Sequence, residues 1–182
     1  MNTATISGGA INNSTFSSSQ AILVSNSTPT ITGLTISGQS GSTNGVRYTN
    51  GRGGTISQST IQNCGLGNGI VIQGNSSPTI NGCTISSNYY YGIIVSSNGS
   101  ASPTIQGNSI SSNGTGTYPG LVFLSQSTGL VIGNTISGSY GGIGCYGGSY
   151  PSSGGSGQKG SNTITSNSYG IICGDGDVRN FV

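Results

Sequence analysis

Hydrophobic residues recur along this chain in short groups, each flanked by polar residues and followed by a turn. The stretch from Pro78 to Val95 shows the pattern. Two β-branched segments, Thr79-Ile80 and Thr84-Ile85, are separated by a corner at Asn81-Gly82-Cys83, and a third segment follows at Gly92 to Val95. Short runs of β-branched residues bounded by Gly, Asn and Ser are typical of strands. Three strands per repeat predict a coil with three sides.

Copies of this unit cover most of the chain. Its first two strands align as nonamers at Ala4–Asn12, Pro29–Ser37, Gly54–Gln62, Pro78–Ser86, Pro103–Ser111, Gly129–Ser137 and, in a diverged copy, Gly157–Thr165. The third strand begins at Ala21, Gly45, Gly69, Gly92, Gly120, Gly142 and Gly170, positions that lie 22 to 28 residues apart. A period of this length is typical of a solenoid. We expect one all-β domain over residues 1–182, a parallel β-solenoid of about seven three-strand coils.

Alternation along each strand assigns one set of side chains to the interior, and stacking places equivalent residues in columns. The third strand contributes two columns: Ile22, Val46, Ile70, Ile93, Leu121, Ile143 and Ile171; and Val24, Tyr48, Ile72, Val95, Phe123, Cys145 and Cys173. The other strands contribute Ile6, Ile31, Ile56, Ile80, Ile105 and Val131; and Ile11, Ile36, Ile61, Ile85, Ile110, Ile136 and Ile164. Burying each such side chain contributes roughly 1.5 to 3 kcal/mol. A single coil should not fold alone, because its neighbours complete the core.

Polar columns mark the corners. One consists of Leu34, Ser59, Cys83, Asn108, Asn134 and Asn162, and another contains Asn88, Asn113 and Asn167. Asn tolerates the left-handed corner conformation, and stacked amides can hydrogen-bond along a column. With these residues the chain resembles the right-handed parallel β-helix repeats of the pectate-lyase-like superfamily, in particular non-catalytic secreted repeats. The resemblance implies a right-handed coil, which the repeat itself does not show.

Composition limits the partners. Only 31% of the residues are hydrophobic and 3% are charged, with a net charge of +2 and no basic cluster, so nucleic acid is not an expected partner. No apolar run is long enough to span a bilayer, and the start MNTATISGG lacks the features of a secretory signal. The scarcity of Lys and Glu is typical of repeats outside the cell, and we expect an extracellular or cell-surface location.

Chemistry that would support catalysis is sparse. Asp175 and Asp177 are the only acids, and the chain has neither His nor Glu. Superfamily members that cleave polysaccharides use clustered acids or calcium-bound carboxylates, whereas these two acids are typical of a solvated turn. A weak calcium-binding role for the pair is the alternative. We expect no enzyme, no metal site and no cofactor.

The four cysteines form no CxxC pattern. Cys145 and Cys173 share an inward column in consecutive coils, where the strand spacing suits a disulfide. Buried thiols are the favoured interpretation at these positions, because Cys is often a small core hydrophobe, and the disulfide is the alternative. Cys64 and Cys83 are expected to remain thiols.

Threonine files on the outward side of the first two strands suggest one function. They consist of Thr30, Thr32, Thr55, Thr79 and Thr104 on one strand and Thr35, Thr60, Thr84, Thr135 and Thr163 on the next. Such a lattice looks like the ice-binding faces of β-solenoid antifreeze proteins. The alternative is that Thr is favoured in strands and forms cross-strand ladders.

The third strand suggests a different function. Its outward central position is aliphatic at Leu23, Val71, Ile94, Val122 and Ile172, while Arg47 and Gly144 at the same position indicate that it is not core. An exposed aliphatic file marks an interface. The leading hypothesis is a structural or adhesive solenoid that associates with itself, laterally through this stripe and head to tail through incomplete or docking coils at residues 1–12 and 170–182.

Tyrosines precede or flank the third strand at Tyr89, Tyr90, Tyr91, Tyr118, Tyr140, Tyr146, Tyr150 and Tyr169. Their rings either stack on sugars, which would make the solenoid bind polysaccharide, or cover the backbone at the corner. Self-association, ice binding and carbohydrate binding are therefore the three hypotheses that the sequence supports.

Overall fold

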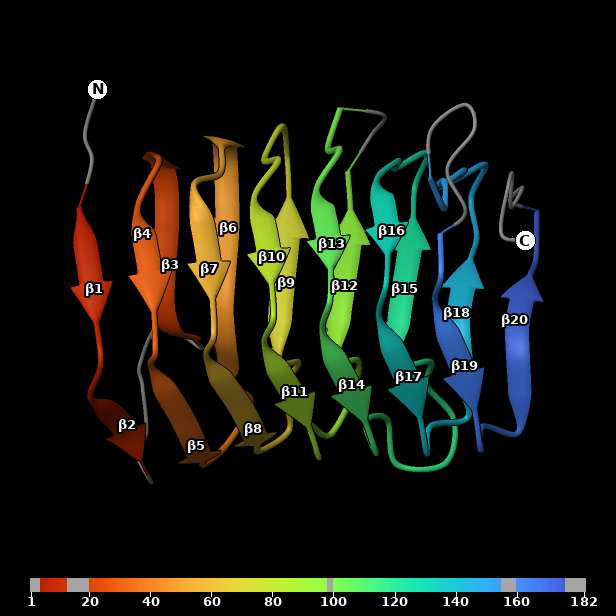
Figure 1. The fold of residues 1–182 in the computed structure, drawn as a ribbon, viewed down its shortest axis with the longest axis horizontal. Coiled ribbons are helices and arrows are strands. Elements are labelled where there is room, and N and C mark those ends of the chain that lie inside the picture. Colours follow the sequence, from red (N-terminus) through yellow and green to blue (C-terminus); the bar gives the residue numbers. More distant parts are fainter. Residues whose placement is uncertain (1–3, 13–19, 98–99, 155–159, 176–182) are drawn as a thin grey trace.

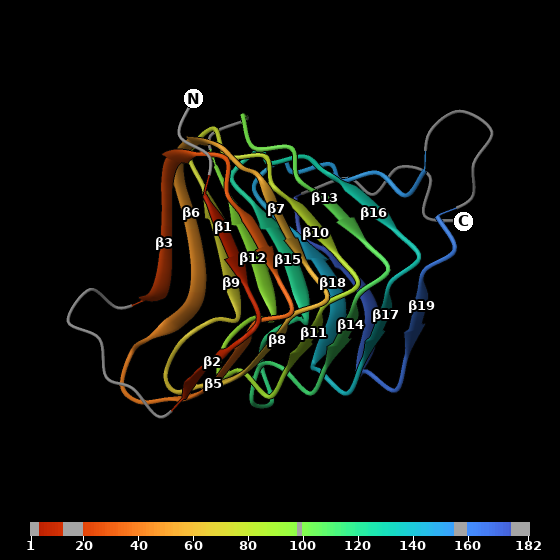
Figure 2. The same ribbon diagram turned by 60° about the vertical axis from the view of Figure 1, so that its left-hand side comes forward.

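The computed structural model describes residues 4–12, 20–97, 100–154 and 160–175, and all of its regular elements are parallel strands. Parts of the expected end coils, residues 1–3 and 176–182, lie outside the described residues. The strands form three sheets that run along one axis (Figures 1 and 2). None of the described residues form a helix long and apolar enough to cross a membrane.

Sheets A and B are built from the two strands of each nonamer. Sheet A has six strands: β1 (Thr5–Ser7), β4 (Thr30–Thr32), β7 (Thr55–Ser57), β10 (Thr79–Asn81), β13 (Thr104–Gln106) and β16 (Leu130–Ile132). Sheet B has seven: β2 (Ala10–Asn12), β5 (Thr35–Gln39), β8 (Thr60–Cys64), β11 (Thr84–Ser86), β14 (Ser109–Ser111), β17 (Thr135–Ser137) and β19 (Thr163–Thr165).

Sheet C is built from the third strand of each coil. Its seven strands are β3 (Gln20–Ser27), β6 (Asn44–Arg52), β9 (Ile70–Gln73), β12 (Ile93–Ser96), β15 (Leu121–Leu124), β18 (Gly141–Cys145) and β20 (Tyr169–Cys173). Every strand pairs with the equivalent strand of the next coil, as when Ile80 pairs with Ile56 on one side and Ile105 on the other. The three-strand coil predicted from the sequence is confirmed.

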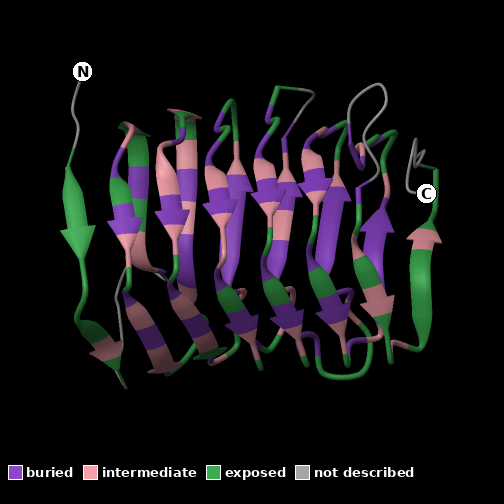
Figure 3. Cartoon of the chain, viewed as in Figure 1, coloured by how far each residue is buried: buried purple, intermediate pink, exposed green. Residues whose placement is uncertain are grey.

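The predicted columns form the core. Ile31, Ile56, Ile80, Ile105 and Val131 of sheet A are buried, and so are Ile36 to Ile136 of the sheet B column and the middle of both sheet C columns. Burial decreases in the first and last coils, where Ile6 is 38% and Ile171 is 36% exposed (Figure 3). Stacking of neighbouring coils thus buries these side chains, as expected for a solenoid.

Glycine stands at or next to the start of the sheet C strand in six of the seven coils, the first having Ala21, because from Gly45 to Gly142 the chain there passes close to the next coil and to the corner of sheet B. A Cβ atom at Gly92 would lie 2.7 Å from the Gly120 oxygen, 2.8 Å from Nδ2 of Asn113 and 2.9 Å from Cγ2 of Ile110. Real Cβ contacts are longer, so a larger residue would push the strand away from the core. This close approach explains why the third strand of the repeat is led by Gly.

Asparagine ladders join the coils at two corners. The side-chain oxygen of Asn134 accepts hydrogen bonds from the backbone N–H and from Nδ2 of Asn108, both at 2.9 Å. The same Nδ2 donates to the Ile80 carbonyl at 3.0 Å. At the other corner, Asn88 donates in the same way to Asn113, with distances of 3.1 and 2.9 Å. The predicted hydrogen-bonded columns are confirmed.

The expectation that these asparagines adopt the left-handed conformation is wrong. The positive φ falls on the residue before each ladder position, at Gly33, Gln58, Gly82, Gly107, Gly133 and Ser161 for one corner and at Gly38, Asn63, Ser87, Ser112, Gly138 and Ser166 for the other. The left-handed residue turns the chain, and the next side chain then points into the corner, where the amide of an Asn bonds to the adjacent coils.

Candidate functional site

The outward face of sheet B is a grid of small uncharged side chains. Its strands contribute pairs two residues apart: Ala10/Asn12, Thr35/Ser37, Thr60/Gln62, Thr84/Ser86, Ser109/Ser111, Thr135/Ser137 and Thr163/Thr165. All of them are exposed or half-buried, while the Ile between each pair from β5 to β17 is buried. The register is unbroken across the seven strands. The face is therefore a continuous surface of uncharged side chains, which carry hydroxyl groups except at Ala10, Asn12 and Gln62.

The most regular part of this grid spans β11, β14, β17 and β19, where every outward residue is Thr or Ser. Neighbouring strands lie about 4.8 Å apart, and side chains on the same face of one strand repeat about every 6.6 Å. Nearer the first coil, the amide of Gln62 donates to Oγ of Ser37 at 3.2 Å, so a longer side chain interrupts the pattern.

The ten predicted threonines divide between two sheets. Thr35, Thr60, Thr84, Thr135 and Thr163 lie on sheet B, and Thr30, Thr32, Thr55, Thr79 and Thr104 lie on sheet A. The sheet A file is less regular. Asn81 and Gln106 follow its hydroxyl residues, and it ends at the apolar Leu130 and Ile132. Sheet B is the better candidate for binding a flat surface.

The predicted aliphatic stripe on sheet C is not an exposed file. Leu23 is 54% exposed, and Ile94 and Ile172 are half-buried, but Val71 is 5% exposed and Val122 is fully buried. The expectation of exposure is therefore wrong for Val71 and Val122. Figure 3 shows β15 and β18 buried along almost their whole length, in contrast with the alternation on β11, β14 and β17.

Two side chains from turns cover the stripe beside Val122. A Cβ atom placed on Gly144 would lie 2.9 Å from Cγ of Pro119, 2.9 Å from Cε2 of Tyr146 and 3.3 Å from Cγ2 of Val122. Gly144 is itself buried. The missing side chain makes room for the proline and tyrosine rings, so this glycine indicates a covered position and the inference from Gly144 to an exposed one is wrong.

Another contact explains the burial of Val71. Its register partner is Arg47, whose Nε and Nη2 donate to Oε1 of Gln73 at 3.1 and 2.7 Å. Gln73 follows Val71 by two residues on the same face of β9. The stem of Arg47 therefore passes along Val71, as long charged side chains commonly do over apolar surface.

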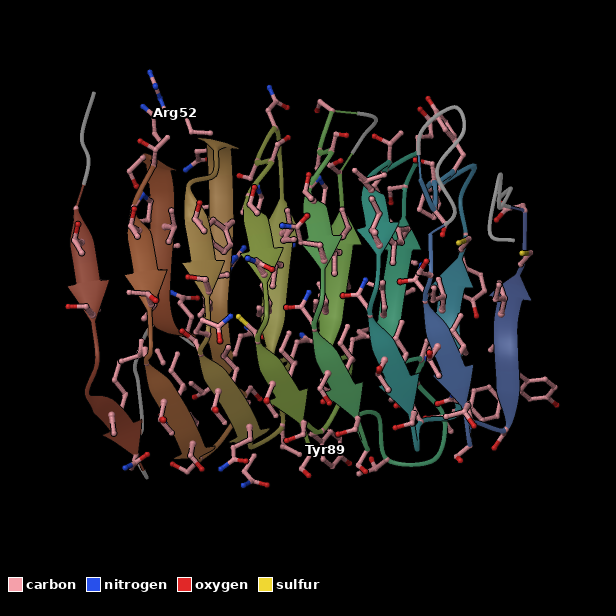
Figure 4. All side chains as sticks on the ribbon, in the orientation of Figure 1. Arg52 and Tyr89 are labelled. Carbon is pink, nitrogen blue, oxygen red and sulfur yellow. The ribbon has the colours of Figure 1, made fainter. Side chains whose placement is uncertain are left out.

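Tyrosine rings gather at the corner between sheets B and C. Tyr90 and Tyr91 each pack edge to face against Tyr118 with ring centroids 5.1 Å apart, and Tyr89 packs on Tyr90 at 4.9 Å. Farther along, Tyr140 and Tyr169 form a similar pair at 5.1 Å. Figure 4 shows Tyr89 at this corner, below β11 and β14, whereas the Arg52 side chain lies at the opposite corner, above β3 and β4. These contacts are those of rings that cover a corner, and sugar binding there stays a prediction.

The four cysteines carry thiols. Cys145 and Cys173 are register partners in neighbouring strands, as the column alignment predicts. Cys64 and Cys83 are buried at separate corners, and burial raises the pKa of the Cys64 thiol to about 12. Cys83 donates to the Ile56 carbonyl at 3.6 Å, and burial raises its pKa as well. Neither buried thiol is a nucleophile at neutral pH.

The groups that could support catalysis or metal binding are few. Asp175 accepts a hydrogen bond from the backbone N–H of Gly147, and Asp177 lies outside the described residues. Within the described ranges no three His, Cys, Asp or Glu side chains group together as metal ligands. The described surface presents mainly hydroxyls, amides and phenols, together with the guanidinium groups of Arg47 and Arg52.

A model of a protein family described as "Right handed beta helix region" matches residues 3–155 of the 182. The match covers most of the chain, including the strands from β1 to β18. No curated protein and no solved structure shows significant similarity to the chain.

Proposed function

The chain belongs to the right-handed β-helix family, and from that premise we propose that it is a non-catalytic, extracellular scaffold that binds ice through sheet B. The observation that carries this proposal is the unbroken register of Thr and Ser side chains on β11, β14, β17 and β19 of that sheet. Fold alone does not indicate function, so the argument rests on this face.

The chemistry of the face suits ordered water. A hydroxyl donates one hydrogen bond and accepts two, much as water does, and the Thr methyl groups lie between the hydroxyls. Ammonium and carboxylate groups are strongly hydrated and would impose their own water structure. The sheet B strands contain no such group. A rigid grid with fixed spacing can hold water in a repeating pattern without first being ordered itself.

Polysaccharide and protein partners fit this face less well than ice does. Protein sites that hold sugar rings use aromatic stacking and convergent polar groups, and the described strands of sheet B contain no aromatic side chain. A protein partner is also disfavoured, because interface centres are enriched in aromatic and aliphatic residues and depleted in Ser. Binding to a lattice of water molecules requires neither aromatic stacking groups nor an apolar interface centre.

Ice recrystallisation inhibition by the purified chain tests the proposal. We expect inhibition by the unmodified protein, loss of inhibition in Thr84→Lys/Thr135→Lys, and retention in the matched control Thr30→Lys, an exposed threonine of sheet A. Circular dichroism should show the same strand content in all three proteins. Absence of inhibition by the unmodified chain, or equal loss in the sheet A control, would overturn the proposal.

Self-association is the second candidate function, and exposed apolar side chains favour it. Leu23, Leu66, Tyr89, Tyr150 and Tyr169 are each more than a third exposed. Aromatic and aliphatic residues of this kind are enriched at protein interfaces. Sedimentation over a wide concentration range should show oligomers that Leu23→Lys/Leu66→Lys weakens, whereas a monomer at every concentration would reject this function.

A further inference from the structure

We propose that Cys145 and Cys173 form a reversible disulfide that ties strand β20 to strand β18. The two residues are register partners and occupy the same inward column of sheet C. The residue after Cys173 is also bonded to Cys145, since the N–H of Gly174 donates to the Cys145 carbonyl at 3.0 Å. No other two cysteines of the chain are register partners in the described strands.

The geometry is close to that of a disulfide without matching it fully. Strand spacing places the two Cα atoms about 4.8 Å apart, which is within the range that disulfides span. The Cβ atoms of register partners point the same way and are separated by a similar distance, about 1 Å more than the usual ~3.8 Å of a disulfide. A small displacement of one strand therefore has to accompany bond formation.

Strand β20 is the one suited to move. It is at the edge of sheet C and hydrogen-bonds to β18 alone among the described strands. Its burial is also low, since Tyr169, Ile171 and Cys173 are exposed, whereas β18 is buried throughout. A bond formed at the expense of such a displacement is strained, and strain makes a disulfide easier to reduce.

Accessibility sets the order of the chemical steps. Cys173 is exposed and Cys145 is buried. With a small organic disulfide as the oxidant, the Cys173 thiolate attacks one of its sulfurs and releases a first small thiol. The Cys145 thiolate then attacks the Cys173 sulfur of the mixed disulfide and releases the second. Two protein thiols lose two electrons and two protons, and the oxidant becomes two thiols.

The remaining cysteines serve as internal references. Cys64 pairs in register with Gln39, and Cys83 donates to two backbone carbonyls at its own corner. Both are buried. We expect them to stay as thiols under conditions that oxidise the pair.

The test uses the full folded chain and oxidised glutathione. After an acid quench, denaturation and alkylation, we expect two alkylated cysteines instead of four, together with a linked peptide pair that contains Cys145 and Cys173. Dithiothreitol at low concentration should restore four alkylated sites. The oxidised form should also melt at a higher temperature, because a cross-link restricts the unfolded chain.

Matched variants keep the test decisive. Cys173→Ser should retain three alkylated sites with or without glutathione, and Cys64→Ser should drop from three sites to one on oxidation. Four alkylated sites after oxidation of the unmodified chain would overturn the proposal. A stable mixed disulfide of Cys173 with glutathione would overturn it equally, since it would show that Cys145 does not reach the neighbouring sulfur.

Discussion

Sheets B and C follow the same alternation in the sequence but present different surfaces. On β11, β14 and β17 the residues on either side of the buried Ile are exposed or half-buried. On β15 the outward Val122 is as fully buried as the inward Leu121 and Phe123. The difference arises outside the strands, because Pro119 and Tyr146 lie against the outward face of sheet C. Alternation therefore fixes the direction of a side chain, while the turns decide whether it meets water.

Placing a charged side chain on the outward face of each sheet should give the largest difference in unfolding free energy between sheets B and C. Val122→Asp should lower the free energy of unfolding by about 3–5 kcal/mol, because it places a carboxylate without a partner in a buried site. Thr84→Asp, on the exposed face of sheet B, should change it by about 0.5 kcal/mol or less. Urea denaturation of both variants measures the two effects. Equal stability of the two variants would contradict the burial of Val122 beneath Pro119 and Tyr146.

Raising the pH tests the burial of the Cys64 thiol, which lies at the end of β8, through its effect on the stability of the fold. The Cys64 pKa is raised to about 12 by burial, whereas in the unfolded chain it is about 8.5. Both states hold the proton below the unfolded pKa, and above it only the unfolded chain ionises, so stability falls as the pH rises through this window. At pH 10 the loss from Cys64 alone should be about 2 kcal/mol. Cys83, whose pKa burial also raises, adds to this loss.

Burial also raises the pKa of Tyr48, so this residue adds to the loss at higher pH. Urea denaturation at pH 7 and pH 10 measures the effect, and Cys64→Ala is the control. An unchanged pH dependence in that variant would show that Cys64 is not the group responsible.

Removing the Tyr146 ring from the outward face of sheet C should make that face more exposed, like the outward face of sheet B. Tyr146→Ala takes away one of the two rings beside Val122 and should cost about 1–2 kcal/mol, since the ring is only half-buried. Amide hydrogen exchange should rise locally in β15 and β18. Faster exchange confined to sheet B would contradict the assignment of Tyr146 to the sheet C face.

The inward columns of the two sheets also differ, and here the smallest effect is expected. The sheet B column is Ile from β2 to β19, whereas sheet C buries Tyr48, whose hydroxyl has no hydrogen-bond partner among the described residues. Tyr48→Phe removes a buried hydroxyl that is not hydrogen-bonded and should raise stability by about 1 kcal/mol. Differential scanning calorimetry would detect this as a higher melting temperature. A lower one would indicate that the hydroxyl is bonded in solution.

Much of the architecture could be predicted from local pattern. The Ile columns and the hydrogen-bonded asparagines repeat at the coil period, and each depends only on the coils next to it, so the sequence contains the whole of the information. The exposure of Val71 and Val122 could not be predicted, because it depends on where Arg47, Pro119 and Tyr146 come to lie. The left-handed residue at each corner was misplaced by one position, since Gly, Ser, Gln and Asn all adopt it here and no residue type marks it.

The asparagine ladder also bears on how such a molecule can change in length over evolution. Each ladder bond joins residues one coil apart, separated by 25 positions between Asn88 and Asn113 and by 26 between Asn108 and Asn134. An amide in a duplicated coil would find the same acceptor above it and the same donor below it. Tandem duplication of one coil would thus add a row to every sheet, including the hydroxyl face, and leave the existing contacts within each coil as they are.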